Sequence, residues 1–437
     1  MLEVKDFYKP ERAFLIGVCL KSEDRVNYDY SFQELVQLAK TAGIEVVDVF
    51  IQPLEKPDSA THIGSGKLKE IISKIPENEI TTLIFNGNLS SSQAKNIAKE
   101  TKCNIVDRTE LILDIFAKHA KTYESGLQVE LAQLEYSYSK LRNLWQHFSR
   151  IAGGVGVGVR GPGEKQIEID RRAVRKRISI LKDKLEEVKK STEIKRKKRS
   201  SQHSICLVGY TNAGKSTLFN LLTKESIYTA DELFATLDST TRTFNMGVKK
   251  DLILTDTIGF IDNLPPTLIQ SFYSTLFEVR HADLLLHVID ISNPDFKRHI
   301  DTVNHILQDM GVIDQNILLV FNKCDLFKSV HNKFIIKDLS NTYRDSVFIS
   351  TKTGENIDKL KQKISHFLNK DKILKKIYIP ENLTKIIAYI HEHTEVQKVK
   401  HLQKHKIYEI DTLIDKKIYK NIQEQLDKTS LFDFINS

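Results

Sequence analysis

No stretch of this sequence is apolar enough to cross a membrane. The longest apolar run, residues 284–291, is interrupted by His287, and it falls short of the roughly 20 residues that a spanning helix needs. Met1 is not followed by a basic and then an apolar segment, so we expect no secretory leader. Leu2 and an ending without cysteine predict no lipid anchor. We therefore expect a cytoplasmic protein with no transmembrane segment, acting as a monomer.

Cysteine is scarce and widely spaced. Only Cys19, Cys103, Cys206 and Cys324 occur, mostly in strand-like runs, which is typical of buried thiols in a reducing compartment and not of disulfides or a metal cluster. The histidines are scattered as well. The pair at 401 and 405 has the spacing of a metal site on a helix, but no carboxylate set lies nearby, so a solvated helix face is favoured.

Positive charge is concentrated in one part of a chain whose composition is otherwise that of an ordinary globular protein. The net charge is +8. One basic cluster comprises Arg171, Arg172, Arg175, Lys176 and Arg177, and a second spans residues 195–199. An isolated run of this kind is often only a solvated helix face. Two clusters flanking one long arm favour a polyanionic partner such as RNA or DNA, because lysine and arginine release counterions from phosphates.

Residues 14–121 alternate between strand-like and helix-like segments. The strand-like segments are 14–20, 44–51, 82–85 and 104–106, and helical stretches include 31–42, 66–75 and 91–101. This alternation predicts a small parallel sheet covered by helices. The stretch Gly64-Ser65-Gly66-Lys67 resembles part of a phosphate loop with the wrong spacing, and it favours a helix start. Whether this domain binds a second nucleotide is left open.

Residues 156–161, Gly-Val-Gly-Val-Arg-Gly, match the G-x-G-x-x-G pattern of dinucleotide-binding loops. That loop works only between a strand and a helix. Here both flanks carry apolar residues at spacings of three and four, which indicates two helices. The apolar positions are Leu127, Leu131, Leu134, Tyr138, Leu141, Trp145 and Phe148 before the loop, and Val174, Ile178, Leu181, Leu185 and Val188 after it. The sequence therefore predicts an antiparallel helical hairpin with a glycine-rich tip.

The chain length leaves room for several domains, and the fold class that we expect is α/β and multidomain. Residues 1–121 form the N-terminal parallel α/β domain, and 122–202 form the helical hairpin with its basic linker. Residues 203–368 show a second alternation of strand-like and helix-like segments, which predicts a further α/β domain. Residues 369–437, lysine-rich with short apolar runs, form a small C-terminal α/β domain.

A strand at 204–208 runs directly into G-x-x-x-x-G-K-[ST] and then into an amphipathic helix. This order of strand, loop and helix makes the motif strong evidence for a phosphate-binding loop. Its backbone N–H groups can curl around the β-phosphate, Lys215 can reach the β and γ oxygens, and the Ser216 hydroxyl can bind Mg²⁺. The nucleotide-binding residues predicted here are Gly209, Tyr210, Thr211, Asn212, Ala213, Gly214, Lys215, Ser216 and Thr217.

Two further motifs follow strands at the distances expected of a GTPase. A strand from 251 ends in D-x-x-G, where Asp256 would hold Mg²⁺ and the N–H of Gly259 would contact the γ-phosphate, with Thr257 and Ile258 between them. The strand from 316 ends in N-K-x-D. In that motif Asp325 accepts the N1–H and N2–H of guanine, which adenine does not offer together, so GTP is selected over ATP. Asn322 would brace the loop and contact the base, the Lys323 stem would cover the ring, and a loop N–H within Ser350, Thr351 and Lys352 could meet guanine O6. Residues 203–368 are therefore expected to form a Ras-like P-loop GTPase domain.

A switch segment is expected between the first two motifs, at Phe234, Ala235 and Thr236. One threonine there must bind Mg²⁺ only when the γ-phosphate is present. Thr236 is favoured, while Thr240 and Thr241 stay open. The metal ligands are then Ser216, Thr236 and Asp256, and the catalytic residues are Lys215, Thr236 and Gly259. Phe260 occupies the position where many GTPases carry a water-orienting glutamine, so we expect slow hydrolysis by the protein alone.

The motifs together resemble the HflX family of translational GTPases, of the TRAFAC class and related to Obg. The resemblance covers about residues 10–365. It rests on the stretches 107–116, 127–134, 160–164, 168–172, 209–217, 233–238 and 256–261. Two departures are visible: the glycine loop is longer by about two residues, and Thr351 replaces the usual alanine.

The resemblance implies a protein that binds GTP and GDP with Mg²⁺ and associates with the 50S subunit and the 70S ribosome. It also implies ribosome-stimulated hydrolysis and separation of stalled or idle ribosomes under stress. In that family the N-terminal domain and hairpin contact 23S rRNA, and the glycine loop approaches the peptidyl transferase centre. An alternative is a GTP-gated factor that binds or assembles the large subunit without splitting ribosomes. A membrane signalling GTPase is disfavoured, since no lipid signal is evident.

Overall fold

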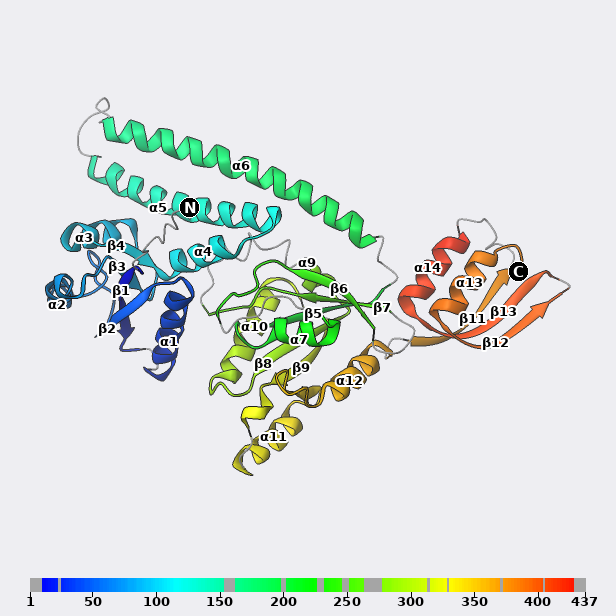
Figure 1. Ribbon diagram of the computed structural model, residues 1–437. Coiled ribbons are helices and arrows are strands. Elements are labelled where there is room, and N and C mark those ends of the chain that lie inside the picture. The colour runs from blue at the N-terminus through cyan, green and yellow to red at the C-terminus, as the bar shows by residue number, and fades with distance from the viewer. Residues whose placement is uncertain are drawn as a thin grey trace, which may run out of the picture. The chain divides into compact units, whose positions relative to one another are not determined.

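The computed structural model describes residues 10–22, 25–152, 162–197, 202–225, 232–245, 251–262, 277–312, 315–327, 330–369, 372–403 and 405–427 (Figure 1). The chain divides into two compact units. One comprises Met1–Lys190, Thr229–Asp238 and Ile258–Thr275, and the other Ser191–Tyr228, Ser239–Thr257 and Leu276–Ser437. Within the described ranges, no helix has the length and hydropathy needed to cross a membrane.

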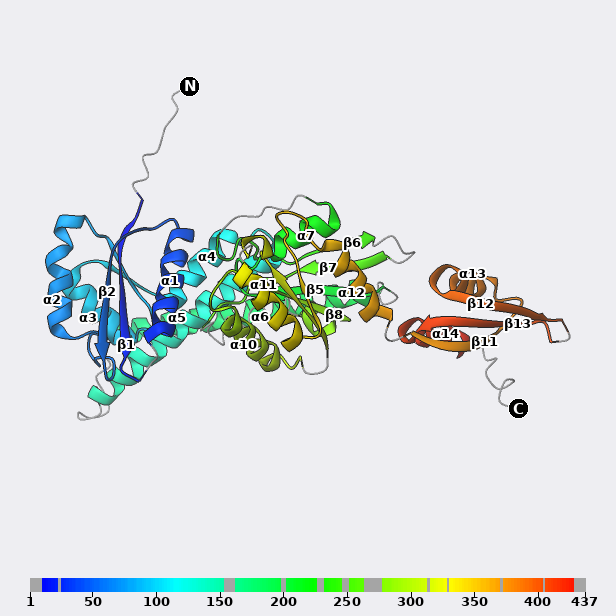
Figure 2. The same ribbon diagram turned by 90° about the horizontal axis from the view of Figure 1, so that it is seen from below.

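The N-terminal unit contains the predicted parallel sheet. Its strands are β1 (Arg12–Leu20), β2 (Glu45–Leu54), β3 (Thr82–Phe85) and β4 (Asn104–Asp107), in the order β2-β1-β3-β4. Between them lie α1 (Arg25–Thr41), α2 (Ser65–Lys74), the short 3₁₀ turn η1 (Pro76–Asn78) and α3 (Ser91–Thr101), with α4 (Arg108–His119) after β4. Helices α2 and α3 lie on one side of the strands and α1 on the other (Figure 2). Gly64 caps α2, which confirms the predicted helix start.

The hairpin consists of α5 (Tyr123–Ala152) and α6 (Pro162–Lys197), as the apolar spacing predicted (Figure 1). Leu127, Leu131 and Leu181 are buried between the helices, and Leu134, Ile178 and Leu185 pack beside them. Ion pairs at 2.7 Å between Arg177 and Glu130 and at 2.8 Å between Lys182 and Glu135 join the two helices at the surface. The glycine loop at 153–161 lies outside the described residues.

The second α/β sheet carries the three predicted nucleotide-binding motifs. Its strands are β5 (Ser204–Gly209), β6 (Thr240–Asn245), β7 (Asp251–Asp256), β8 (Leu284–Asp290), β9 (Asn316–Asn322) and β10 (Ser346–Phe348). The order is β10-β9-β8-β5-β7-β6, and all neighbours are parallel except β6, which is antiparallel to β7. The accompanying helices are α7 (Lys215–Thr223), α9 (Phe277–His281), α10 (Phe296–Asp309), α11 (Val330–Thr342) and α12 (Ile357–Asn369), with the 3₁₀ turn η2 at Cys324–Leu326.

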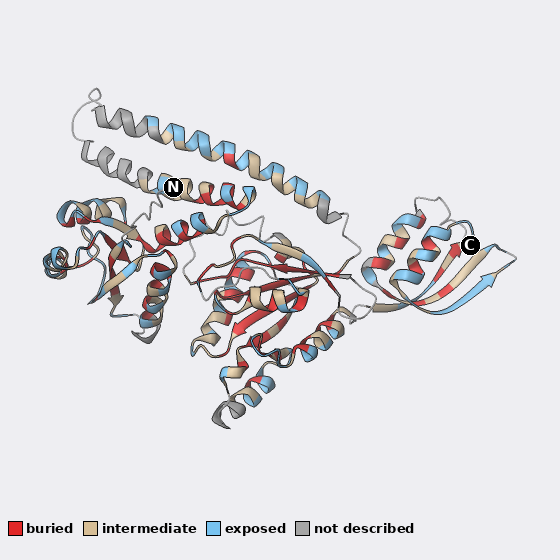
Figure 3. Ribbon diagram, viewed as in Figure 1, coloured by how far each residue is buried: buried red, intermediate tan, exposed pale blue. Residues whose placement is uncertain are grey.

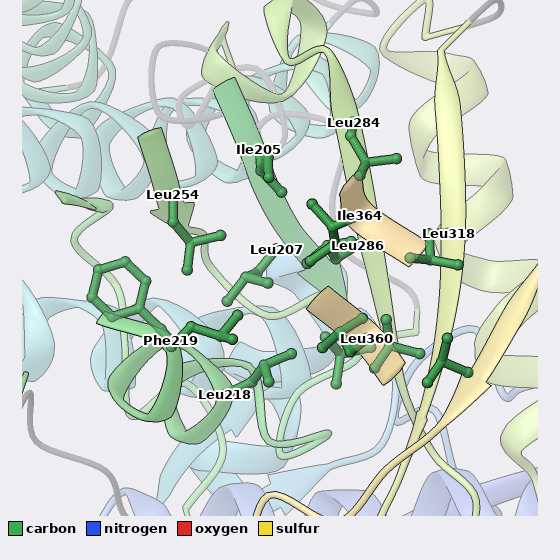
Figure 4. Packing of buried hydrophobic residues seen from close by; sticks show 14 of the residues in the cluster. Ile205, Leu207, Leu218, Phe219, Leu254, Leu284, Leu286, Leu318, Leu360 and Ile364 are labelled. Atoms are coloured by element: carbon green, nitrogen blue, oxygen red, sulfur yellow. The ribbon is translucent and has the colours of Figure 1, made fainter. Parts of the chain in front are cut away.

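The core of this sheet comes from the apolar strand runs, which are buried on both faces as expected for parallel strands. Figure 4 shows strand side chains packed against residues of α7 and α12. Each of these side chains is fully buried: Ile205, Leu207, Leu254, Leu284, Leu286 and Leu318 from the strands, and Leu218, Phe219, Leu360 and Ile364 from the helices. Figure 3 shows the same contrast between buried strands and the more exposed outer faces of the helices.

The C-terminal region forms the small α/β domain that the sequence predicted. It comprises β11 (Lys372–Pro380), α13 (Thr384–His393), β12 (Glu395–Leu402), β13 (Ile407–Asp415) and α14 (Lys416–Asp427). The three strands are antiparallel in the order β11-β13-β12. Ile377 and Ile410 from the strands form one buried cluster with Ile390 and Ile422 from the helices.

The interpretation of the histidine pair as part of a helix face was wrong. His401 lies in β12, and His405 lies in the turn that follows. The ladder pairs His401 with Tyr408, whose ring centroid is 4.6 Å away, so the backbone bonds of the hairpin override the helical spacing. Within the described part of the chain, no group of three or more histidine, cysteine or acidic side chains is placed to hold a metal ion. None of the four cysteines forms a disulfide bond in the described structure, and Cys19 is only half-buried.

Candidate guanine-nucleotide site

The motif residues follow strands whose carboxyl ends share one edge of the second sheet. β5 ends at Gly209, β7 at Asp256 and β9 at Asn322, and these strands run parallel. After β5 the chain forms β6 and β7 on one side of that strand, and then β8 and β9 on its other side. Such a switch in direction is where open α/β sheets bind ligands.

Glycine is required at two positions of the phosphate-binding loop. Gly209 has φ +151°, and a Cβ there would lie 2.2 Å from the carbonyl oxygen of Val288. Gly214 has φ +93°, and a Cβ would lie 2.2 Å from Nδ2 of Asn322. Gly214 also caps α7, whose first N–H groups therefore point into the loop. Backbone donors at a helix N-terminus suit a phosphate, so the loop has the geometry that its motif predicts.

Lys215 is folded inside this loop. Its side chain is buried, and Nζ donates to the carbonyl oxygens of Gly209 at 3.1 Å and Tyr210 at 2.8 Å. Burial lowers the pKa of Lys215 to about 8. A buried ammonium gains strongly from a nearby anion. The lysine is thus poised to bind a phosphate oxygen.

Ser216 and Asp256 form the polar centre of the site. The Ser216 hydroxyl donates to Oδ2 of Asp256 at 2.6 Å, and the Asp256 carboxylate is completely buried. Burial raises the pKa of Asp256 to about 6. Among the described residues, Oδ1 of Asp256 has no hydrogen-bond partner. A buried carboxylate with an unsatisfied oxygen beside a hydroxyl fits Mg²⁺, which prefers oxygen ligands.

Asn322 links the phosphate-binding loop to the loop after β10. Its Nδ2 donates to the carbonyl of Ala213 at 2.9 Å, and its Oδ1 accepts the N–H of Thr351 at 3.0 Å. The side chain is completely buried, so both bonds are shielded from water. Asn322 thus joins the two loops, while its contact with the guanine base stays a prediction.

Asp325 is held by the same loop. Ser350 donates through its hydroxyl to Oδ1 of Asp325 at 2.6 Å and accepts the N–H of Thr353 at 3.1 Å. Lys323 has φ +63°, and its Nζ pairs with Asp290 at 2.7 Å. Lys352 is exposed. The carboxylate of Asp325 is therefore oriented by Ser350, a partner that the sequence predicted only as a contributor of backbone.

We call residues 233–238 the switch segment. Leu233, Phe234 and Leu237 within it are buried. This segment, Gly259 and the buried Phe260 group with the N-terminal unit, whereas 209–217, 256–257, 322–325 and 350–352 belong to the other unit. The described hydrogen bonds bring the latter set together, and the roles of Phe234, Ala235, Thr236, Ile258 and Gly259 stay predictions.

The two alternative switch threonines lie in β6. Thr240 is paired with Asp256, and the Thr241 hydroxyl lies 3.1 Å from the Thr255 hydroxyl within the sheet. A hydroxyl that is bonded inside a β-ladder is poorly suited to join a metal only in one nucleotide state. This arrangement supports Thr236 over Thr241.

Two aromatic groups near the site were not anticipated. The Tyr210 ring stacks on the ring of His299 in α10, with centroids 3.7 Å apart and an angle of 6°. His287 is buried in the middle of β8. No sequence pattern pairs Tyr210 with His299, but a histidine inside an otherwise apolar run was visible as an exception.

We expect His287 to make folding sensitive to mild acid. Burial lowers the pKa of His287 to about 3, whereas an unfolded histidine titrates near 6.5. Below pH 6.5 the unfolded chain therefore binds a proton that the folded chain refuses, so stability is lost as the pH falls towards 3. This amounts to about 2 kcal/mol between pH 6.5 and 5 for one group. Urea unfolding at pH 6.5 and at pH 5 measures this loss in the free energy of unfolding, for wild-type protein and for a His287→Leu variant. An equal acid sensitivity in both proteins would contradict this assignment.

Comparisons with known proteins match most of the chain. Three family models match: "GTP-binding GTPase N-terminal" at residues 29–117, "GTP-binding GTPase Middle Region" at 119–199 and "50S ribosome-binding GTPase" at 204–323. GTPase HflX of Flavobacterium psychrophilum is 42% identical over 384 residues, covering 83% of this chain and 92% of that protein. GTPase HflX of Escherichia coli is 39% identical over 361 residues, covering 82% and 83%.

Among solved structures, that of SsGBP in complex with GDP is 27% identical. It covers 82% of this chain and 98% of that one, with a TM-score of 0.46. Both curated relatives are more than 30% identical to this chain and cover more than two thirds of it. The chain therefore belongs to the HflX family of GTPases.

Proposed function

We propose that this GTPase works on the large ribosomal subunit and that its cycle promotes dissociation of stalled or idle 70S ribosomes. The match of residues 204–323 to a family described as 50S ribosome-binding GTPases supports the partner. The observation that carries the proposal is a basic helix face in the same chain as a guanine-nucleotide site. Arg172, Arg175, Lys176 and Arg177 are all exposed on α6.

In the proposed reaction, each motif residue binds or orients one part of the nucleotide. Lys215 binds the β and γ oxygens, and Asp325 accepts the N1–H and N2–H of guanine, which gives GTP selectivity. Ser216, Asp256 and Thr236 hold Mg²⁺, which when bound offsets the charge of the phosphates. The N–H of Gly259 contacts the γ-phosphate, and a loop N–H within 350–352 meets guanine O6.

Hydrolysis by the protein alone is proposed to be slow. Phe260 follows the D-x-x-G motif, and its ring is buried. A phenylalanine has no polar atom with which to orient the attacking water, unlike the glutamine of many GTPases. A ribosomal contact would then complete or reorder the site, so that GTP is consumed mainly on the ribosome.

The basic face of α6 is proposed to contact 23S rRNA. Some of its charge has a structural use, since Arg177 pairs with Glu130, and Arg175 donates to the Tyr138 hydroxyl at 2.6 Å. Arg172 and Lys176 are exposed on the same stretch of helix. Arginine and lysine side chains at the surface can neutralise phosphates.

Neutralising this face should weaken the salt dependence of ribosome binding. In a variant carrying Arg172→Gln, Arg175→Gln and Lys176→Gln, the slope of log affinity against log salt should fall by roughly 0.7 to 0.9 for each phosphate that is no longer neutralised. Co-sedimentation with 50S subunits over a range of salt concentrations measures the slope. A variant with Lys359, Lys361 and Lys363 changed to glutamine removes equal charge from the α12 region and should keep it. An unaltered slope in the α6 variant would show that these residues are merely solvated.

The alternative is a GTP-gated factor that binds or assembles the large subunit without splitting ribosomes. Light scattering of 70S ribosomes mixed with the protein and GTP separates the two functions. A fall in scattering that requires the intact phosphate-binding loop supports splitting. Binding to 50S subunits with no fall in scattering under any nucleotide condition supports the alternative.

A further inference from the structure

The switch segment is packed on the helices of the N-terminal unit. The Phe234 ring meets the Phe116 ring of α4 edge-on, with centroids 4.6 Å apart. The N–H of Leu233 donates to the Thr41 hydroxyl at the end of α1, at 3.3 Å. Phe234 also adopts φ +57°, an unusual conformation for a bulky residue that persists only where the surroundings enforce it.

At its other end, the switch segment contacts the start of the hairpin helix α5. Oδ1 of Asp238 accepts the hydroxyl proton of Thr122 at 2.7 Å, and Oδ2 accepts the N–H of Lys121 at 3.1 Å. Thr122 immediately precedes α5, and its hydroxyl oxygen accepts the N–H of Ser125 at 3.1 Å. Asp238 thus extends the N-terminal cap of α5, and its negative charge is favourable at a helix N-terminus.

Thr236 lies between these two sets of interactions. Beyond Asp238 the chain is ordered again at once, because β6 begins at Thr240, which is paired with Asp256. Fixing the backbone of a residue that is otherwise free to move costs conformational entropy. A segment that is already held on both sides of its threonine therefore loses less entropy when that threonine joins the metal.

We propose that Asp238 is a positioning residue that couples the nucleotide state to the first turn of the α5 arm. By holding the switch segment on α5, it lowers the entropic cost of bringing Thr236 to the Mg²⁺ of bound GTP. Linkage makes the effect reciprocal: GTP that orders the segment also tightens the cap of α5. GDP lacks the γ-phosphate, so its binding does not order the switch segment in this way. This inference rests on the proposed role of Thr236.

Nucleotide affinities of an Asp238→Ala variant test the proposal without ribosomes. We expect the affinity for a non-hydrolysable GTP analogue to fall about 5- to 10-fold, in the range typical of coupled sites. The GDP affinity should stay within about twofold of wild type, because the phosphate-binding loop is unchanged. Asp238→Asn should recover much of the affinity, since its amide oxygen can still accept the Thr122 proton.

Asp58→Ala is the matched control. Asp58 is also exposed in the N-terminal unit and accepts two backbone N–H groups, those of Ala60 at 2.8 Å and Thr61 at 2.9 Å. This substitution removes the same kind of interaction at a site remote in sequence from the switch segment. We expect no change in the ratio of analogue to GDP affinity.

Hydrogen exchange of residues 121–126 gives an independent readout. In wild-type protein, these amides should exchange more slowly with the analogue than with GDP, and Asp238→Ala should remove the difference. Equal exchange in the two wild-type states, or an Asp238→Ala variant that loses affinity for both nucleotides alike, would overturn the proposal. If Asp238→Ala does not fold, Phe116→Leu weakens the packing on the other side of Thr236 and should lower analogue affinity selectively. If the protein does not act on ribosomes, the proposed function is refuted, but the role of Asp238 is not. If wild-type protein does not bind the GTP analogue, both proposals are refuted.

Discussion

A Lys215→Ala variant should lose GTP and GDP binding, with affinities reduced at least about a hundredfold. In the structure, Lys215 is buried with its ammonium on the carbonyls of Gly209 and Tyr210, inside the loop that receives the phosphates. Each hydrogen bond from a charged donor contributes about 1.5 to 3 kcal/mol, and the β and γ oxygens offer at least two. Equilibrium binding of a fluorescent guanine nucleotide measures the reduction.

The same variant also needs a test of folding, because a buried ammonium is removed from the loop. Thermal unfolding should show a folded domain, since the core around Leu207 and Phe219 is unaffected. Lys361→Ala on α12 removes a partly exposed lysine and should bind nucleotide as wild type does. A folded Lys215→Ala protein with unchanged GTP affinity would refute the phosphate-loop assignment.

An Asp325→Asn variant should change base preference from guanine towards xanthine. The carboxylate accepts two protons of guanine, whereas asparagine offers one acceptor and one donor, which match N1–H and the C2 carbonyl of xanthine. Ser350 can still donate to the remaining side-chain oxygen, so the loop should keep its shape. We expect GTP affinity to fall and XTP affinity to rise, each by about 10- to 100-fold.

Competition between GTP and XTP for the labelled site provides the measurement. Asp358→Asn makes the same chemical change on a fully exposed carboxylate of α12 and should leave the preference for GTP intact. If Asp325→Asn still prefers GTP over XTP, Asp325 does not read the base edge.

Most of the fold could be predicted because periodicity and motif order agree. The strand at 204–208, the glycines of the loop and the helix after Lys215 all require one another, so the phosphate-binding loop was predicted residue by residue. The hairpin was equally predictable, since Leu127, Leu131 and Leu181 recur at helical spacing and are buried together. In each case the information is local and repeated.

The interactions that could not be predicted join residues that are far apart in sequence. Nothing near Thr122 indicates that Asp238 will bond to it, and nothing near Tyr210 indicates His299. Histidine spacing at 401 and 405 was misleading because strand pairing with Tyr408, a tertiary effect, overrides a pattern read along one segment. Sequence motifs therefore predicted the nucleotide-binding residues, whereas the interactions that support these residues could be seen only in the folded structure.

We propose that GTP hydrolysis by this chain depends on the large ribosomal subunit. The test is steady-state phosphate release from GTP and from ATP. It is measured against increasing concentrations of purified 50S subunits at modest ionic strength. We expect slow phosphate release from GTP alone, a saturable rise with 50S subunits, and little release from ATP throughout. A rate of phosphate release that does not change with the concentration of 50S subunits, or that is equal for GTP and ATP, would refute this proposal.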